Sequence, residues 1–149
     1  MPFRFSLQAV LRLRESFERR ERQRLEVVTR EVVKARQQRE LAKLDRANAL
    51  NRLQKTLHQG MSAMEMQFEL ACDRTRIRRI AAMNDHLAKL EDLRRRQLEV
   101  FRKAQQQRKI LENLRDRQIA AYRLVQDRRT QQQMDDRFLI MHAGKTLDL

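Results

Sequence analysis

The residues of this chain best suited to chemistry are three histidines, one cysteine and many carboxylates, and they form no recognisable catalytic or metal-binding motif. His58, His86 and His142 lie far apart, whereas the ligands of a local metal site recur at short spacing. Cys72 is the only cysteine, so the chain contains no disulfide of its own, and a reducing compartment is the simplest interpretation. The sequence has no glycine-rich phosphate loop, no HExxH and no CxxC. We therefore expect a protein that is not an enzyme, with no cofactor and no metal.

Positive charge is the strongest bias in the composition. Lysine and arginine number 34 against 20 acidic residues, which gives a net charge of +14. Such a chain is attracted to nucleic acid, to anionic lipid or to an acidic protein surface. Its basic residues are not interleaved with aromatic residues that stack on bases, and no nucleic-acid-binding motif appears. We therefore expect no specific nucleic acid, and arginines that solubilise the chain or dock proteins.

The residues that must position these charges are almost all strong helix formers. Charged residues make up 36% of the chain and aromatic residues only 5%, which is too polar for a thick globular core. The 41% of hydrophobic residues is enough for the narrow apolar stripe of a coiled coil. Pro2, Gly60 and Gly144 are the only proline and glycines. The composition therefore predicts an all-α fold of long helices.

Gly60 marks the one good position for a turn. It can adopt the left-handed conformation that ends helices, and Ser62 with Glu65 matches a capping box that starts the next helix. A competing turn at residues 72–75 lacks glycine and ranks second. We expect an antiparallel coiled-coil hairpin in a single domain over residues 1–149. Helix one runs from about 6 to 59, the turn is at about 60–62, helix two runs from about 63 to 143, and Gly144 and a short tail follow.

Apolar residues three and four apart predict the contact stripe of each helix. Helix two exceeds helix one by roughly 25 residues, so an overhang of roughly 35–40 Å is expected beyond the N-terminus. The glutamates at 15, 18, 21 and 26 are expected on a solvated face. The predicted stripe comprises Leu7, Val10, Phe17, Leu25, Val28, Val32, Ala35, Arg39, Ala42, Leu50, Leu53 and Leu57 in helix one, and Ile77, Ile80, Asn84, Leu87, Leu98, Phe101, Leu111, Leu114, Gln118, Ala121 and Val125 in helix two.

Three segments carry the patterns of one protein family. Residues 3–15 read FRFSLQAVLRLRE, similar to an F-x-F-x-L-x-x-V-L-x-x-R-E start. Residues 108–118 read RKILENLRDRQ, similar to R-K-x-L-E-x-L-x-x-R, and residues 131–136 read QQQMDD, similar to K-K-M-D-E. Together, over nearly the whole chain, they resemble the FliJ family of flagellar export proteins.

The resemblance implies a stalk of the bacterial type III export apparatus, at the cytoplasmic face of the inner membrane. Its implied partners are the hexameric export ATPase, which the stalk enters and stimulates, the cytoplasmic linker of the membrane export gate, and the export chaperones. The end that would meet the ATPase ring contains Phe3, Phe5, Arg12, Arg14, Arg123, Arg128, Arg129, Met134 and Phe138. The gate-contact candidates after the turn are Phe68, Leu70 and Ile77.

Other interpretations of the sequence remain open at this stage. The related stalks of non-flagellar injectisomes share the same architecture. A basic coiled coil that binds nucleic acid or an anionic membrane is the main alternative from another class, and a purely structural homodimeric coiled coil is a third. The sequence does not decide between a monomer and a dimer. No apolar stretch approaches the ~20 residues of a transmembrane helix.

Overall fold

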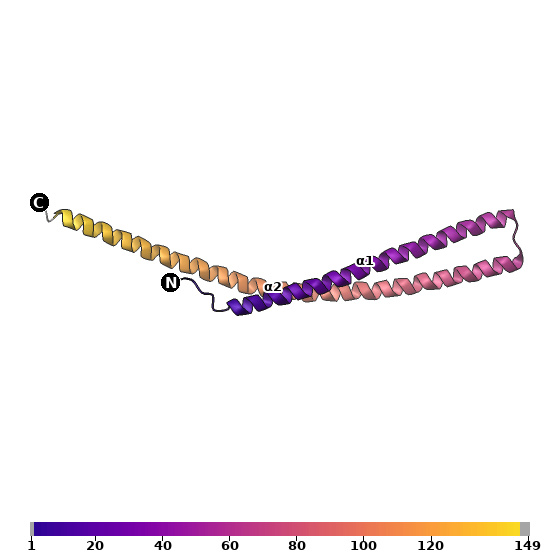
Figure 1. The fold of residues 1–149 in the computed structure, drawn as a ribbon, viewed down its shortest axis with the longest axis horizontal. Coiled ribbons are helices and arrows are strands. Elements are labelled where there is room, and N and C mark those ends of the chain that lie inside the picture. The colour runs from indigo at the N-terminus through magenta and orange to yellow at the C-terminus, as the bar shows by residue number, and fades with distance from the viewer. Residues whose placement is uncertain (1, 147–149) are drawn as a thin grey trace. The chain divides into compact units, whose positions relative to one another are not determined.

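The protein consists of two long α-helices joined by a short turn (Figure 1). The computed structural model describes the backbone of residues 2–146 and the side chains of residues 2–143. Helix α1 spans Gln8–Gln59, with 52 residues, and helix α2 spans Ala63–Thr146, with 84 residues. The described residues contain no strand. The predicted all-α hairpin of two long antiparallel helices is confirmed.

The turn lies at Gly60, as its residue type indicates. Gly60 has a φ of 104°, a left-handed conformation that a side chain disfavours, and its N–H donates to the carbonyl of Leu57 at 3.3 Å. The capping box is formed: the Glu65 N–H donates to Ser62 Oγ at 3.2 Å, and the Ser62 N–H donates to Glu65 Oε2 at 2.8 Å. The competing turn at residues 72–75 is wrong, because these residues lie within α2.

Gly144 does not end the second helix. The expected end was at about residue 143, whereas α2 continues to Thr146. Of the described residues, only Gly60 is a glycine with positive φ, so Gly144 does not take the left-handed conformation of a helix stop. A single glycine within a helix costs only about 1 kcal/mol relative to alanine, which is too little to break a helix on its own. Residues 147–149 of the expected tail lie outside the described residues.

The chain divides into two units that are described separately. The hairpin unit, residues 19–103, contains the turn and the facing parts of both helices. Its core is a small cluster of Val32, Ala35 and Leu87, with Leu90 packed against it. Such a core is thin, as expected where each helix buries one narrow stripe against a single partner.

The terminal unit, residues 1–18 with 104–149, pairs the N-terminal segment with the C-terminal half of α2. Leu11 is fully buried there and Phe5 is 8% exposed. The ring of Phe3 lies 5.7 Å from that of Tyr122. The N-terminal segment thus ends beside Tyr122, and α2 continues past it (Figure 1). The 24 residues from 123 to 146 correspond to about 36 Å of helix, which agrees with the expected overhang.

The contact stripe follows a more regular register than the apolar residues alone suggest. An unbroken series of buried and half-buried residues in alternating steps of three and four runs from Leu11 to Leu53 in α1 and from Met66 to Arg115 in α2, and other half-buried residues flank it. Many predicted members belong to it, but ten predicted members are exposed: Leu7, Val10, Leu50, Leu57, Ile77, Asn84, Leu114, Gln118, Ala121 and Val125. The apolar residues alone give an irregular stripe, because charged residues occupy some of its positions.

Two of the glutamates that were expected on a solvated face instead lie in the contact stripe. Glu18 and Glu21 are 4% and 5% exposed. Glu18 forms an ion pair with Arg108 within the terminal unit. Glu21 accepts a hydrogen bond from Gln97 at 2.7 Å within the hairpin unit. Each carboxylate has a polar partner across the helix pair, which is the condition under which a charge can be buried.

Candidate partner-binding surfaces

The N-terminal residues proposed to meet a ring divide into buried anchors and exposed charge. Phe5 is buried and Phe3 is half-buried against Tyr122, so both hold the segment onto α2. Arg14 is half-buried and donates to Gln107 Oε1 at 2.7 Å. Arg12 is exposed. Of these four candidates, Arg12 is therefore the one freely accessible to a partner, while the other three fix the geometry of the terminal unit.

The C-terminal candidates lie on the part of α2 that has no helix beside it in the terminal unit. Arg123, Arg128 and Arg129 are exposed. Met134 is 65% and Phe138 is 60% exposed, and the Phe138 ring stacks on His142 at 4.1 Å. Every described side chain from residue 127 to 143 is exposed. An apolar and charged helix of this kind can bind a partner without first breaking contacts within its unit.

The three gate-contact candidates lie in the hairpin unit and remain exposed, but they do not share one face. Phe68 is 66% exposed, Leu70 43% and Ile77 45%. Leu70 and Ile77 are seven residues apart and lie on the same side of α2, whereas Phe68 lies about 160–180° away, nearer to Met64. A single flat partner surface could therefore contact Leu70 with Ile77, or Phe68 with Met64, but not all three candidates.

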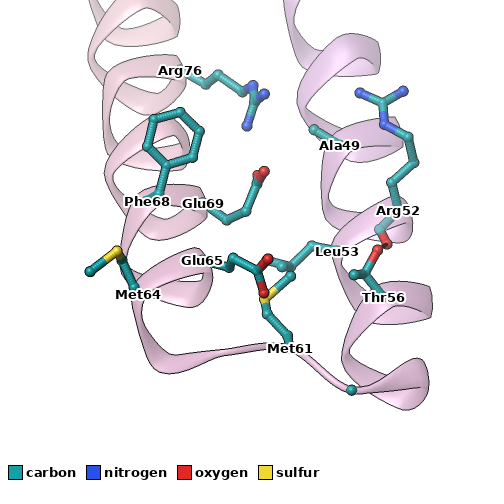
Figure 2. A pocket seen from close by; sticks show the side chains of 11 residues that line it. Ala49, Arg52, Leu53, Thr56, Met61, Met64, Glu65, Phe68, Glu69 and Arg76 are labelled. Atoms are coloured by element: carbon teal, nitrogen blue, oxygen red, sulfur yellow. Dashed lines mark hydrogen bonds between the residues drawn. The ribbon is translucent and has the colours of Figure 1, made fainter.

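A groove of about 690 Å³ opens beside the turn, between the ends of α1 and α2 (Figure 2). Glu65, Glu69 and Arg76 extend from α2 towards α1, and Met61 from the turn projects between the helices. Phe68 and Met64 form its α2 rim. Flexible methionines beside an exposed phenylalanine give a surface that can adapt to an apolar partner.

Ion pairs hold the hairpin unit together on either side of its thin core. Arg46 donates to both oxygens of Asp73, at 2.8 and 3.0 Å, and this bidentate contact lowers the pKa of the Asp73 carboxyl. Arg36 donates to Glu91 at 2.5 and 3.1 Å and lowers the pKa of that carboxyl. At the turn, the backbone N–H of Ser62 lowers the pKa of Glu65. Charge here fixes which residues of the two helices face each other.

The described residues offer no site for catalysis that we can identify. Within them, no group of three or more His, Cys, Asp or Glu side chains is placed to hold a metal ion. No helix in the described part of the chain is both long enough and apolar enough to cross a membrane. The grooves are open depressions on helix pairs, and none carries converging groups of an acid–base pair.

Sequence reasoning missed the polar residues that set the register. Arg46, Asp73, Glu18 and Arg108 each occupy a stripe position and pair across the helices. The repeat itself identifies them. In α1, Val28, Val32 and Ala35 fix a repeat whose steps of three and four reach Glu18 and Arg46. In α2, Ile80 and Leu87 fix a repeat that reaches Asp73 and Arg108 in the same way.

Two long helices that pair through a narrow stripe of apolar and charged residues define a coiled-coil protein. The family model described as "Flagellar FliJ protein" matches residues 3–146, which is nearly the whole chain. The chain therefore belongs to the FliJ family of structural stalk proteins and is a component of the flagellar protein export apparatus. Searches of curated proteins and of solved structures found no match.

Proposed function

We propose that this chain is the stalk that enters the hexameric export ATPase and stimulates it, with its C-terminal overhang as the inserted part. The observation that carries this proposal is the overhang itself. About 24 residues of α2 extend past the N-terminal segment, and the described side chains from 127 to 143 are all exposed. A shaft inside a ring needs shallow, largely electrostatic contacts, because deep apolar anchoring would lock it in one position.

The charges of the overhang suit this role. Arg123, Arg128 and Arg129 stand on a helix with solvent around it and can pair with carboxylates that line a ring. Met134 and Phe138 add apolar contact further along. Arg12 contributes exposed charge from the N-terminal helix, whereas Phe3 and Phe5 act by holding that helix in place.

The test is stimulation of the purified export ATPase by variants of the full chain. Reversing Arg123, Arg128 and Arg129 to Glu should weaken the apparent affinity for the ring by about tenfold to a hundredfold, since each exposed pair contributes up to about 1 kcal/mol. The difference from wild type should shrink as salt rises, because salt screens both the attraction of the wild-type arginines and the repulsion that the reversed charges add. Truncation after Gln126 should abolish stimulation while circular dichroism still reports helix, because the Phe3–Tyr122 contact is retained.

A matched control reverses two exposed arginines of the hairpin unit, Arg78 and Arg79, to Glu. This control should stimulate the ATPase normally. Full stimulation by the truncated chain would end the proposal in this orientation. If the reversals at Arg123, Arg128 and Arg129 chiefly lowered affinity for duplex DNA, with a steep dependence on salt, the nucleic-acid function would replace it.

We further propose that the other end of the hairpin contacts the export gate and the export chaperones at the cytoplasmic face of the membrane. Support comes from the exposed Phe68, Leu70 and Ile77 and from the adaptable groove at Met61 and Met64. The separation of Phe68 from Leu70 and Ile77 around α2 makes two contact surfaces available there, so the gate linker and a chaperone need not compete for one patch.

A further inference from the structure

Four charged residues near the end of α2 have no opposite charge three or four positions away along their own helix. A helical side chain meets the residues three and four positions away. For Arg128, Arg129, Asp135 and Asp136, every residue at those positions is uncharged. All four are exposed, and over the described residues 123–143 none of them forms an ion pair. Arg96, by contrast, has Asp92 four positions away and pairs with it at 2.8 Å.

The order of these charges is self-complementary about Gln132. The two arginines lie four and three residues before Gln132, and the two aspartates lie three and four residues after it. The apolar flanks repeat the same symmetry, because Val125 and Leu139 each lie seven residues from Gln132. When the segment is aligned with an antiparallel copy of itself, each arginine pair therefore lies opposite an aspartate pair, and apolar residues lie opposite apolar residues.

These residues share one face of α2, which we call the pairing face. At 100° per residue, all of them lie within about 60° of the direction of Gln132. Tyr122, which contacts Phe3, lies about 80° around the helix, and Ile119, which lines a groove with Phe3, lies about 140° around it. The N-terminal segment therefore lies away from the pairing face. The pairing face comprises Ala121, Val125, Arg128, Arg129, Gln132, Asp135, Asp136, Leu139 and Ala143, all exposed in the structure.

We propose that the pairing face binds the same face of a second copy of the chain, with the two helices antiparallel and Gln132 at the two-fold centre. This arrangement sets Arg128 and Arg129 of each copy against the Asp135–Asp136 pair of the other. By symmetry the contact occurs twice, as in any isologous dimer. A parallel pairing would set arginine on arginine and aspartate on aspartate, so charge selects the antiparallel form.

The dimer is weak and sensitive to salt. The overlap from Ala121 to Ala143 covers about 33 Å of helix but contains few large apolar residues, so the interface is small and transient. Exposed ion pairs contribute modestly and are screened by salt. The contacts between α1 and α2 within each chain do not change, so each hairpin is still formed by a single chain.

Self-pairing does not rest on the proposed ATPase function, but it would regulate it. Arg123, Met134 and Phe138 lie about 120° or more from the pairing face and stay accessible in the dimer. Arg128 and Arg129 are needed for both contacts, so ring and second copy compete for them. The dimer would be a storage form. Its C-terminal overhang would become available when dilution separates the two copies or when the ATPase ring binds one of them.

The test is sedimentation velocity on full-length protein, over a series reaching about 200 µM because a small interface associates weakly. Wild-type protein should sediment faster as concentration rises. Arg128→Asp/Arg129→Asp makes the face wholly acidic, and Asp135→Arg/Asp136→Arg makes it wholly basic. Each variant alone should associate at least tenfold more weakly than wild type, while a mixture of the two should recover a dimer, since each supplies the charge that the other lacks.

Cross-linking reports the orientation of the two copies. With Cys72→Ser removing the native thiol, Gln132→Cys should form an intermolecular disulfide under mild oxidation, because it lies at the two-fold centre. Ala121→Cys, on the same face but far from the centre, should not, whereas a parallel dimer would link both positions. The control Arg78→Asp/Arg79→Asp changes net charge equally and should leave self-association intact.

Several results would overturn the proposal. In sedimentation, these are a wild-type protein that stays monomeric throughout the series, charge variants that associate as strongly as wild type, or a mixture of the two variants that does not form the dimer. In cross-linking, the contradicting result is equal disulfide formation by Gln132→Cys and Ala121→Cys. The ATPase proposal is tested separately by Arg123→Glu/Phe138→Ala, which lies off the pairing face. That variant should reduce stimulation while self-association stays unchanged, so failure of one proposal is distinguishable from failure of the other.

Discussion

The hairpin unit and the C-terminal stretch of α2 are built from similar residues but satisfy them in opposite ways. In the hairpin unit, Val32 and Leu87 are buried and Arg46 meets Asp73 through two hydrogen bonds. Along residues 127–143 the described apolar and charged side chains are all exposed. The contact stripe of the first region is paired within the chain, whereas the side chains of the second region remain exposed.

This difference shows how residues that stabilise the fold can be distinguished from residues that are accessible to partners, in a long helix whose composition hardly changes. Helix propensity is high in both regions, so it does not distinguish them. The two regions differ in whether a second helix packs against the contact stripe of the first. A charge with a partner across the helix pair fixes register, whereas an exposed charge such as Arg128 or Asp136 has no such role within the chain and is accessible to other molecules.

The largest expected contrast comes from truncating one leucine in each region. Leu87→Ala should lower the free energy of unfolding by about 2–4 kcal/mol, because Leu87 is 4% exposed and packs against Val32 and Ala35 in the buried cluster of the hairpin unit. Leu139→Ala should change it by less than about 0.5 kcal/mol, because Leu139 is 64% exposed. Thermal unfolding followed by circular dichroism at low protein concentration measures both. Equal losses would contradict the proposed division between the two regions.

The two glycines provide a contrast of intermediate size. Gly60→Ala should destabilise the hairpin by about 1–2 kcal/mol, because alanine disfavours the left-handed region and Gly60 has a φ of 104°. An added methyl group would meet no atom within 4 Å, so the cost is conformational rather than steric. Gly144→Ala, within α2, should be neutral or stabilising by less than about 1 kcal/mol. Chemical denaturation of both variants provides the test, and a neutral Gly60→Ala would show that the turn tolerates another backbone conformation.

The sequence predicted the hairpin, its turn and the length of the overhang because each depends on local chemistry. Gly60 and the Ser62–Glu65 box act within a few residues, and their hydrogen bonds form as expected. The register was harder, since Glu18 and Arg108 are polar but lie in the contact stripe through a long-range pair. The ATPase, gate and chaperone contacts depend on other proteins, and the surfaces named for them remain predictions.

The smallest expected effect is on the response to acid. Arg46 lowers the pKa of Asp73 below its ordinary value of 3.8, so the ionised carboxylate stabilises the folded hairpin. A group with a lowered folded pKa contributes fully above its ordinary pKa, and the contribution is lost as pH falls through the folded value. The melting temperature should therefore fall below about pH 4. Asp73→Asn should start lower at neutral pH and show a shallower fall, while Asp127→Asn, exposed on the C-terminal stretch, should follow wild type. Identical pH profiles for Asp73→Asn and wild type would show that this ion pair does not contribute to holding the hairpin unit together.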